Sequence, residues 1–421
     1  MRFPVPRGRI SHHLSEDFST LVQALTGPLH DHEDIEVFQA DFAKYLGCEF
    51  CIAFPFARTA IWAALKSANI EPGSKVLMPP LTVKPILDVV LALGLVPQFV
   101  DLSLETASFD EVRLQEALET RPKAVILTYL FGAVPNLNSM TQMLRKANVF
   151  IIEDFSQALG GTFEGQPLGT FGDVGVYSAS SVKTLDTYGG GLAVTNDPLV
   201  SERLRSHQSQ LNAPSRPDLI RKVLTSIVRN LATHPAVFSW STYPFVKSSR
   251  KSSSRKSDRF VGIRSAEPLE KLPDSWFKSF TAVQAQFGIK HLRLLDARLA
   301  ERKRKAVIVL NLSGITHRPK ACTGGDHAYW QNIVYVNDFN VAREHFYRHG
   351  IDTARTSLPL LTNIYPMLKP QQTPNAKFIS ENGLYLPCSE LISESSLRRV
   401  GHAAGLLRLM QDSDHESQLH D

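Results

Sequence analysis

Four polar side chains follow the ends of predicted strands, and their types are those that catalysis requires. Asp154 ends a buried apolar strand, and Gln157 lies three residues later. A carboxylate at such a place is costly to bury unless a cation meets it. Ser178 ends a second strand, and Lys183 follows it by five residues, before the glycine run at 189–191. Burial would lower the pKa of Lys183 from about 10.4 and leave a neutral amine that can attack a carbonyl.

A turn earlier in the chain is suited to a phosphate. The segment Phe56-Ala57-Arg58-Thr59-Ala60 opens a predicted helix. Amides at the start of a helix, together with the helix dipole, attract anions. Any turn between a strand and a helix supplies such amides, so the turn by itself indicates little. The glycine run at 189–191 favours a tight turn and close approach of the backbone.

Together, these residues predict a binding site for pyridoxal 5'-phosphate (PLP). PLP needs a lysine for its Schiff base and a carboxylate that keeps the pyridine nitrogen protonated. It also needs a donor near the ring hydroxyl, and amides and hydroxyls around the phosphate. In that order, the chain offers Lys183, Asp154, Gln157, and Ser178 with the turn at Ala57, Arg58 and Thr59.

The elements that would position these residues alternate between strand and helix. Between about residues 50 and 200, short β-branched runs alternate with amphipathic segments, which predicts an α/β fold with a mostly parallel sheet covered on both faces. Ligands of such sheets bind beyond the carboxyl ends of the strands. The predicted strands are Lys75–Met78, Gln98–Asp101, Ala124–Tyr129, Val149–Asp154, Val174–Ser178 and Leu192–Thr195, and the predicted helices are Thr59–Ser67, Ile86–Leu93, Glu111–Thr120 and Ser139–Ala147.

The second half of the chain departs from this pattern. Residues 213–275 form an insertion rich in Ser, Lys and Arg, with ten basic residues against two acidic ones between Arg216 and Arg259. One long helix is predicted over Ser279–Leu310, and a smaller α+β unit follows it. The predicted division is a large domain over 1–275, a connecting helix over 276–311 and a small C-terminal domain over 312–421.

Composition excludes several classes of protein. The chain has 421 residues, of which 43% are hydrophobic and 21% charged, so it can bury a large core and is not disordered as a whole. A net charge of +5 is too small to indicate nucleic acid as a partner. The first residues lack the apolar region of a signal peptide, and the apolar stretch 89–96 is too short to span a bilayer. With four cysteines, too few for a disulfide framework, we expect a cytoplasmic protein.

On these motifs, the sequence resembles the DegT/DnrJ/StrS-type aminotransferases, which are sugar aminotransferases of PLP fold type I. The resemblance covers about residues 2–212 and 276–408, and its most specific parts are IIEDFSQALGG at 151–161 and the Ser-x4-Lys element within 169–197. It implies a large domain with a seven-stranded sheet and a homodimer with active sites at the subunit interface. It agrees with the cofactor roles given above to Asp154, Gln157, Ser178 and Lys183.

The resemblance also implies a reaction. An amino donor, glutamate by family habit, gives its amino group to the carbonyl of a sugar, nucleotide-linked in our prediction, or of a related compound. Lys183 and Asp154 would be the catalytic residues, with Lys183 moving the proton between substrate and cofactor. Two alternatives stay open: a PLP-dependent dehydratase or lyase of the same fold, and a non-catalytic scaffold or sensor. Some relatives that lack the lysine use histidine and dehydrate instead, so the presence of Lys183 favours transamination.

Several positions differ from the family's pattern. Ala57-Arg58-Thr59 stands in place of Ser-Gly-Thr, and we favour a solvent-facing Arg58 over one paired with a phosphate or a substrate anion. Val83 stands where many relatives stack an aromatic ring on the cofactor. Ser180 and Tyr129 replace frequent histidines, and Phe277-Lys278-Ser279-Phe280 replaces an Asn-x-Arg-Met element. We infer a substrate unlike the common nucleotide-linked ketosugars, or one bound differently.

Three remaining features have simpler interpretations. The apolar stripe at 219–231 predicts an amphipathic helix beside basic residues. Such a helix could lie on an anionic membrane through 216–259, but we favour a helix that covers the partner subunit, followed by a disordered loop. Cys48-x-x-Cys51 has no second pair, so we favour packing and predict no metal site. We take His12 and His13 as surface residues.

Overall fold

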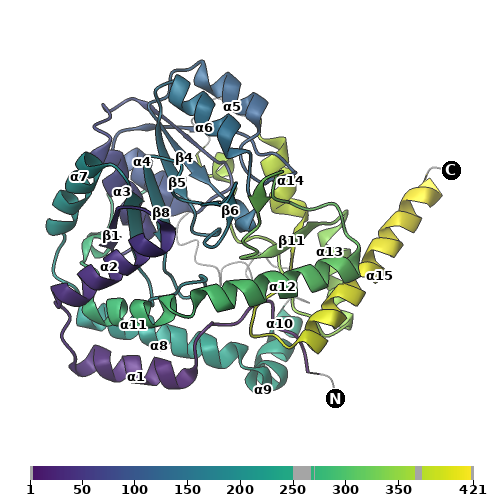
Figure 1. The fold of residues 1–421 in the computed structure, drawn as a ribbon. Helices are drawn as coiled ribbons and strands as arrows, with labels where there is room; N and C mark the ends of the chain where they lie inside the picture. The colour runs from purple at the N-terminus through teal and green to yellow at the C-terminus, as the bar shows by residue number, and fades with distance from the viewer. Residues whose placement is uncertain (1–2, 250–266, 270, 366–371, 419–421) are drawn as a thin grey trace.

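A seven-stranded sheet forms the centre of the fold in the computed structural model, which describes residues 3–249, 267–269, 271–365 and 372–418 (Figure 1). The strand order is β1-β9-β8-β5-β4-β2-β3. Within this sheet β9 is antiparallel to both of its neighbours, and the other neighbouring pairs are parallel. The mostly parallel seven-stranded sheet is therefore confirmed. Its strands are β1 (Phe50–Phe54), β2 (Lys75–Met78), β3 (Val96–Phe99), β4 (Ala124–Thr128), β5 (Phe150–Asp154), β8 (Val174–Ser178) and β9 (Gly191–Thr195).

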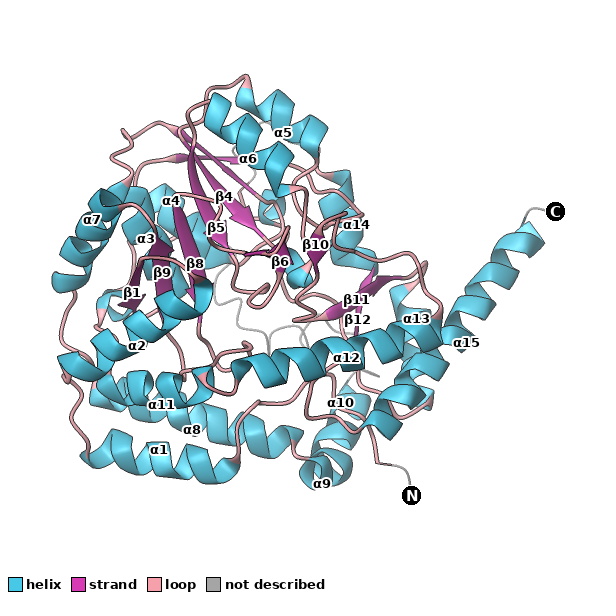
Figure 2. Cartoon of the chain, in the orientation of Figure 1, coloured by secondary structure: helices cyan, strands magenta, loops and turns pink. Residues whose placement is uncertain are grey.

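Helices cover both faces of this sheet (Figure 2). Because successive side chains of a strand point to opposite faces, Ile151 of β5 packs into one core and Ile152 into the other. Helices α2, α5 and α6 contribute to the core of Ile151, and α3, α4 and α7 to the core of Ile152. These helices are α2 (His32–Leu46), α3 (Ala57–Ser67), α4 (Lys84–Ala92), α5 (Glu111–Leu118), α6 (Leu137–Lys146) and α7 (Pro198–Ser209).

The segments that carry the predicted site residues lie at one edge of the sheet. Strand β1 runs parallel to β5 and β8, because each of two antiparallel pairings reverses the direction once. Asp154 and Ser178 end β5 and β8, and the turn 56–59 follows β1. Strand β9 begins at the same edge, where Gly191 pairs with Ser178. The topology thus brings together at one edge the segments that carry the predicted residues.

The connecting helix differs from the prediction. In place of one helix over 279–310, the structure has α11 (Ala282–Leu292) and α12 (Leu295–Ser313). The two helices pack on different partners, α11 on α1 (Leu14–Thr26) and α2, and α12 on α15 (Glu394–Gln418). A break at 293–294 lets each helix turn its apolar face to its own partner.

The C-terminal part contains a small antiparallel sheet with its own core. Strands β11 (Asn332–Tyr335) and β12 (Gly383–Leu386) pair there, flanked by α13 (Phe339–Arg348), α14 (Pro374–Asn382) and α15. A second small sheet of β10 (Gly325–Asp326), β6 (Thr162–Phe163) and β7 (Gln166–Pro167) joins this part of the chain to the loop after β5. Short 3-10 helices occupy Leu130–Gly132, Asp274–Phe277 and Leu361–Asn363. The domain boundaries at 275 and 311 stay a prediction.

The insertion begins with helix α8 (Arg216–Thr233), which starts where Ser215 caps the amide of Asp218. Leu219, Val223 and Ile227 are buried in a core that they share with α1, whereas Leu224 and Val228 are exposed. The amphipathic helix is confirmed. The favoured hypothesis was that this helix covers the partner subunit, but the buried part of its apolar stripe packs on its own chain. Helix α9 (Pro235–Val237), a π-helical turn (Phe238–Thr242) and α10 (Tyr243–Ser249) follow.

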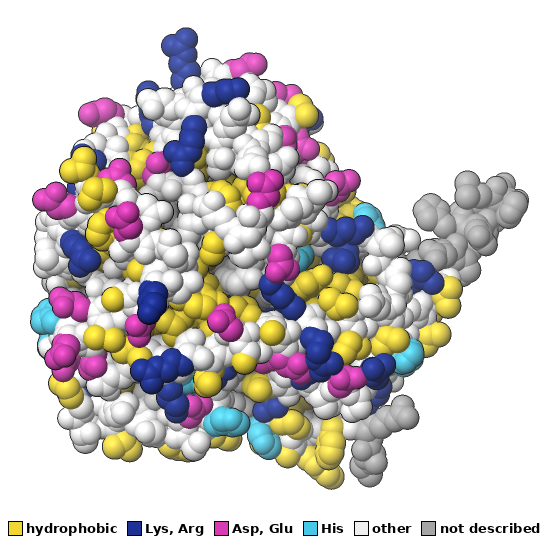
Figure 3. Space-filling model, in the orientation of Figure 1, with side chains coloured by type: hydrophobic (Ala, Val, Ile, Leu, Met, Phe, Trp, Pro, Cys, Tyr) yellow, Lys and Arg dark blue, Asp and Glu magenta, His cyan; other side chains and the backbone are white. Residues whose placement is uncertain are grey.

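The structure gives little support to contact of the insertion with a membrane. The basic segment 250–259, and with it the predicted disordered loop, lies outside the described residues. In the part of the chain that is described, no helix combines the length and the apolar character needed to cross a bilayer. On the face drawn in Figure 3, basic, acidic and hydrophobic side chains are interspersed.

Candidate active site

Lys183 and Asp154 come from segments at the carboxyl edge of the sheet, and the charge of each affects the pKa of the other. Lys183 lies in the loop that follows β8 and is half-buried. Desolvation lowers its pKa to about 8, and the charge of Asp154 acts against this effect. Asp154 is buried, which raises its pKa, while Ser156 and the charge of Lys183 act to lower it. The structure thus brings together the acid and the amine that the sequence predicts.

Ser156 links the ends of the two strands that carry these residues. Asp154 Oδ1 accepts a hydrogen bond of 3.1 Å from the Ser156 amide, and Ser156 Oγ accepts one of 3.0 Å from the Ser178 amide. Ser178 is half-buried, and no residue in the described part of the chain bonds its hydroxyl. The hydroxyl can therefore serve a ligand at this edge.

Gln157 holds a strained turn with one end of its amide. Its Oε1 accepts a hydrogen bond of 2.8 Å from the Phe131 amide. Phe131 has φ +61°, a conformation that is costly for a bulky residue and needs such support. Nε2 of Gln157 donates to none of the described side chains or carbonyls. The donor end is thus available for a ligand hydroxyl.

Tyr129 does not face a substrate, contrary to the inference from its position in the family's pattern. It is fully buried, and its hydroxyl donates a hydrogen bond of 2.5 Å to Glu153 Oε2. Glu153, next to Asp154 on the opposite face of β5, also accepts bonds from the amides of Gly169, Phe171 and Gly172. Burial raises the pKa of Glu153. Tyr129 is therefore part of a structural network that anchors the 169–172 turn.

The predicted phosphate turn opens α3, and the glycine run fits closely against it. A Cβ on Gly191 would lie 2.3 Å from the carbonyl carbon of Phe56, so only glycine fits there. Thr59 Oγ1 donates a hydrogen bond of 2.7 Å to the Trp276 carbonyl, which commits its hydroxyl to the protein. Ala57 and Arg58 occupy the first positions of the helix, where amides lack partners within the helix. The turn can therefore offer amides, but not the Thr59 hydroxyl.

The structure contradicts the prediction that Arg58 faces solvent. Its guanidinium lies between two rings, 3.7 Å from the centre of Phe56 and 4.3 Å from that of Trp276. Its Nε is buried and has no hydrogen-bond partner among the described residues. Desolvation lowers the pKa of Arg58 to about 10. The ring of Phe56, two residues earlier in the chain, and the ring of the distant Trp276 are the reason that the side chain turns inward.

Two residues near the site were not foreseen. Trp330, from the segment before β11, lies with its ring centre 3.9 Å from Lys183 Nζ, and its Nε1 donates to the Val182 carbonyl at 3.1 Å. Lys222 of α8 lies with Nζ 4.8 Å from the centre of the Phe56 ring. No local sequence signal marked Trp330. For Lys222, its place beside the apolar stripe of an amphipathic helix was a usable signal.

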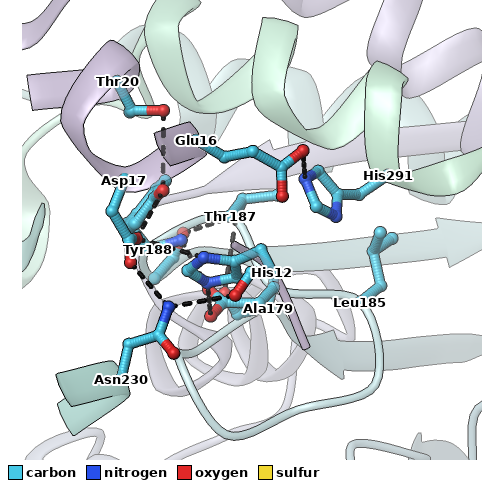
Figure 4. A network of polar contacts seen from close by, with 12 residues as sticks. His12, Glu16, Asp17, Thr20, Ala179, Leu185, Thr187, Tyr188, Asn230 and His291 are labelled. Atoms are coloured by element: carbon cyan, nitrogen blue, oxygen red, sulfur yellow. Dashed lines mark hydrogen bonds and ion pairs between the residues drawn. The ribbon is translucent and has the colours of Figure 1, made fainter. Parts of the chain in front are cut away.

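A buried charge network supports the loop that carries Lys183 (Figure 4). Nε2 of His12 lies 3.1 Å from Asp186 Oδ2, and Nδ1 lies 3.1 Å from Asp17 Oδ1. Tyr188 and Asn230 donate hydrogen bonds of 2.9 Å to Asp17. Burial disfavours the charge of His12, but the two carboxylates outweigh this effect and raise its pKa to about 9. The expectation of a surface position for His12 is wrong, because the side chain is completely buried.

The residues at this edge match the chemical needs of PLP. Lys183 and Asp154 supply the amine and the acid, and Val83, which precedes α4 and is 44% exposed, can meet the face of a ring. The unpartnered, buried Nε of Arg58 and the helix start suit the phosphate.

Part of the chain is similar in sequence to aminotransferases of a known family. The sequence profile of the DegT/DnrJ/EryC1/StrS aminotransferase family matches residues 14–218. The chain is 30% identical over 182 residues to L-glutamine:2-deoxy-scyllo-inosose aminotransferase of Streptomyces kanamyceticus, which is 43% of each chain. It is 31% identical over 179 residues to GDP-perosamine synthase of Caulobacter vibrioides, which is 42% of this chain and 48% of the relative. The match thus spans less than half the length of these two curated relatives.

A solved structure extends the likeness to nearly the whole chain. It is the E. coli GDP-4-keto-6-deoxy-D-mannose-3-dehydratase with bound hydrated PLP, with a TM-score of 0.72 and 16% sequence identity. The superposition covers 96% of this chain and 100% of the dehydratase. At this identity the likeness establishes the fold, which is that of the PLP enzymes of fold type I.

Proposed function

Residues 14–218 belong to the DegT/DnrJ/EryC1/StrS aminotransferase family, and from this premise we propose that the chain is a PLP-dependent aminotransferase. The observation that carries the proposal is the pair of Lys183 and Asp154, an amine of lowered pKa and a buried acid at one edge of the sheet. By name, the two curated relatives reported above are an L-glutamine:2-deoxy-scyllo-inosose aminotransferase and a GDP-perosamine synthase.

Each cofactor-binding residue has a proposed task. When bound, PLP supplies an aldehyde that condenses with amines and a ring that draws electrons from the bond to be broken. Lys183 Nζ would hold the aldehyde carbon, and the carboxylate of Asp154 would keep a proton on the ring nitrogen. Gln157 Nε2 would donate to the ring hydroxyl, and Val83 would contact the ring face. The Ser178 hydroxyl and the turn at Ala57, Arg58 and Thr59 would hold the phosphate.

Lys183 is also the proposed acid and base. A pKa of about 8 lies close enough to neutrality for its Nζ to take up and release a proton during each turnover. The Trp330 ring, which contacts this side chain, keeps it from bulk water on one side.

The proposed substrates follow from the family. Glutamate or glutamine is the amino donor, and the acceptor is the carbonyl of a sugar, nucleotide-linked, or of a related compound, which gives the protein a role in amino sugar biosynthesis. A dehydratase or lyase reaction is the second candidate, because the fold is shared with the dehydratase named above. A scaffold or sensor without catalysis is the third.

The proposal includes a cytoplasmic homodimer with active sites at the subunit interface. Helix α1 presents Phe18, Val22 and Leu25, which are 54%, 59% and 53% exposed and would be covered by a partner. All four cysteines are free, which suits a reducing compartment. Sedimentation equilibrium should give twice the chain mass of 46.9 kDa. A mass of one chain would contradict the dimer.

Release of an oxo acid tests the reaction. The PLP-loaded protein is incubated with glutamate or glutamine in the absence of an acceptor. We expect about one equivalent of the oxo acid per chain, and none from Lys183→Ala. Asp154→Ala should bind PLP and react at least about 100-fold more slowly, equivalent to about 3 kcal/mol of barrier. Release from Lys183→Ala at the wild-type rate would refute the assignment. No release from the wild-type protein would favour the other two candidates.

A further inference from the structure

Two cations from distant segments meet over one aromatic ring at the start of α3. Arg58 lies 3.7 Å and Lys222 4.8 Å from the centre of the Phe56 ring. The end of the Lys222 side chain also lies against the glycine run, since its Cε and Nζ are 3.4 Å from the place of a Cβ on Gly189. The insertion helix α8 therefore reaches the predicted phosphate turn of its own chain.

The acids whose charges act on these cations form ion pairs with other side chains. Asp88, whose charge acts on Arg58, forms an ion pair of 2.7 Å with Lys84. Asp218, whose charge acts on Lys222, forms an ion pair of 2.9 Å with Arg221. Within the described part of the chain, Arg58 and Lys222 thus have no carboxylate of their own.

Such a pair is unfavourable unless an anion joins it. Desolvation and the neighbouring charge of Arg58 lower the pKa of Lys222 to about 8. Within the part of the chain that the structure describes, the buried Nε of Arg58 has no hydrogen-bond partner. A phosphate monoester carries close to two negative charges at neutral pH and can accept several hydrogen bonds. A phosphate would therefore supply the negative charge that Arg58 and Lys222 lack and an acceptor for the Nε of Arg58.

We propose that Arg58 and Lys222 form a two-cation site that binds the phosphate of PLP, so that the insertion helix α8 supplies a cofactor-binding residue in its own chain. This inference rests on the proposed function. It gives the helix of the 213–275 insertion a task that its length and basic composition alone do not indicate. Phosphate groups of a nucleotide-linked acceptor share this chemistry, and the experiment distinguishes them from the cofactor.

The test compares PLP with pyridoxal, which has the same aldehyde and ring but no phosphate. Cofactor-free full-length protein is titrated with each compound, and binding is followed by absorbance. For Lys222→Met we expect the dissociation constant of PLP to rise about 10- to 100-fold and that of pyridoxal to change less than about threefold. Lys222→Arg should restore most of the affinity for PLP. Arg229→Met, which changes an exposed basic residue of the same helix, is the matched control and should bind both compounds as the wild type does.

The outcomes separate this inference from the proposed function. Unchanged affinity for PLP in Lys222→Met, with oxo acid still released from glutamate, overturns the two-cation site and leaves the aminotransferase in place. An equal loss of affinity for PLP and pyridoxal also overturns it, because the effect then does not depend on the phosphate. If affinity for PLP is unchanged and only the Michaelis constant of a phosphorylated acceptor rises, the site serves the acceptor. If the wild-type protein binds neither compound, both the inference and the proposed function fail.

Discussion

Nζ of Lys183 lies 3.9 Å from the centre of the Trp330 ring, although the two residues come from different parts of the fold. Lys183 follows β8 of the large sheet, and Trp330 precedes β11 of the small one. The indole Nε1 also bonds the carbonyl of Val182, the residue before the lysine. The C-terminal part of the chain thus fixes the loop on which the proposed chemistry depends.

Two replacements of Trp330 should separate the effect of its ring contact with Lys183 from the effect of its hydrogen bond to Val182. Trp330→Phe keeps a ring beside Lys183 and loses the bond to Val182, whereas Trp330→Ala loses both. We expect the release of oxo acid in a single turnover to slow less than about threefold in the first variant and about tenfold or more in the second. Trp240→Ala, at a position that is 78% exposed, should have no effect. Equal rates in the two Trp330 variants would show that the ring contact has no role.

Gly191→Ala should disturb the predicted phosphate turn. The new Cβ would lie 2.3 Å from the Phe56 carbonyl carbon, and backbone atoms must shift to relieve the contact. We expect a loss of about 2 kcal/mol or more in the free energy of unfolding, and weaker binding of PLP. Gly8→Ala, where no atom lies within 4 Å of a Cβ, should stay within about 0.5 kcal/mol of the wild type. Chemical denaturation measures both, and equal stability of the two variants would argue against the close fit.

Tyr129→Phe should change stability and leave kinetics intact. The substitution removes the hydroxyl that donates to the buried Glu153, which keeps three backbone donors. The expected loss is about 1–3 kcal/mol in the free energy of unfolding. The Michaelis constant of the amino donor should not change, because Tyr129 is fully buried. A changed Michaelis constant at unchanged stability would place Tyr129 in contact with substrate after all.

The charge of His12 should make stability depend on pH. Its folded-state pKa is about 9, above the ordinary value of 6.5, so the folded state binds the proton more tightly than the unfolded state does. The stabilisation is complete below about pH 6.5 and is lost as the pH rises through about 9. Its size is on the order of 3 kcal/mol. Urea unfolding of the wild type and His12→Gln measures the difference, which should shrink with rising pH. A constant difference from pH 6 to 10 would contradict the charged state.

The local parts of this molecule follow from its sequence. Strands β2 and β8 have the predicted bounds. Asp154 was found because it ends a strand with an apolar pattern, and Lys183 because it follows another such strand by five residues. Strand β1 has a single β-branched residue, Ile52, and was not assigned. Strand β3 begins two residues before the prediction, because its pairing with β2 starts at Val96.

The long-range contacts do not follow from local patterns. Arg58 turns inward because Trp276 supplies a second ring, and His12 is buried because Asp17 and Asp186 surround it. Lys222 reaches the glycine run only because α8 packs along α1. Each of these positions depends on how distant segments pack, and residue type and spacing carry no information about that.

The most direct test of the account is to reduce the PLP-loaded protein with borohydride and to locate the modified residue by peptide mass spectrometry. The account predicts that the reduced cofactor is attached to Lys183 and that Lys183→Ala carries no stable attachment. Attachment to another lysine, or equal labelling of Lys183→Ala, would contradict it.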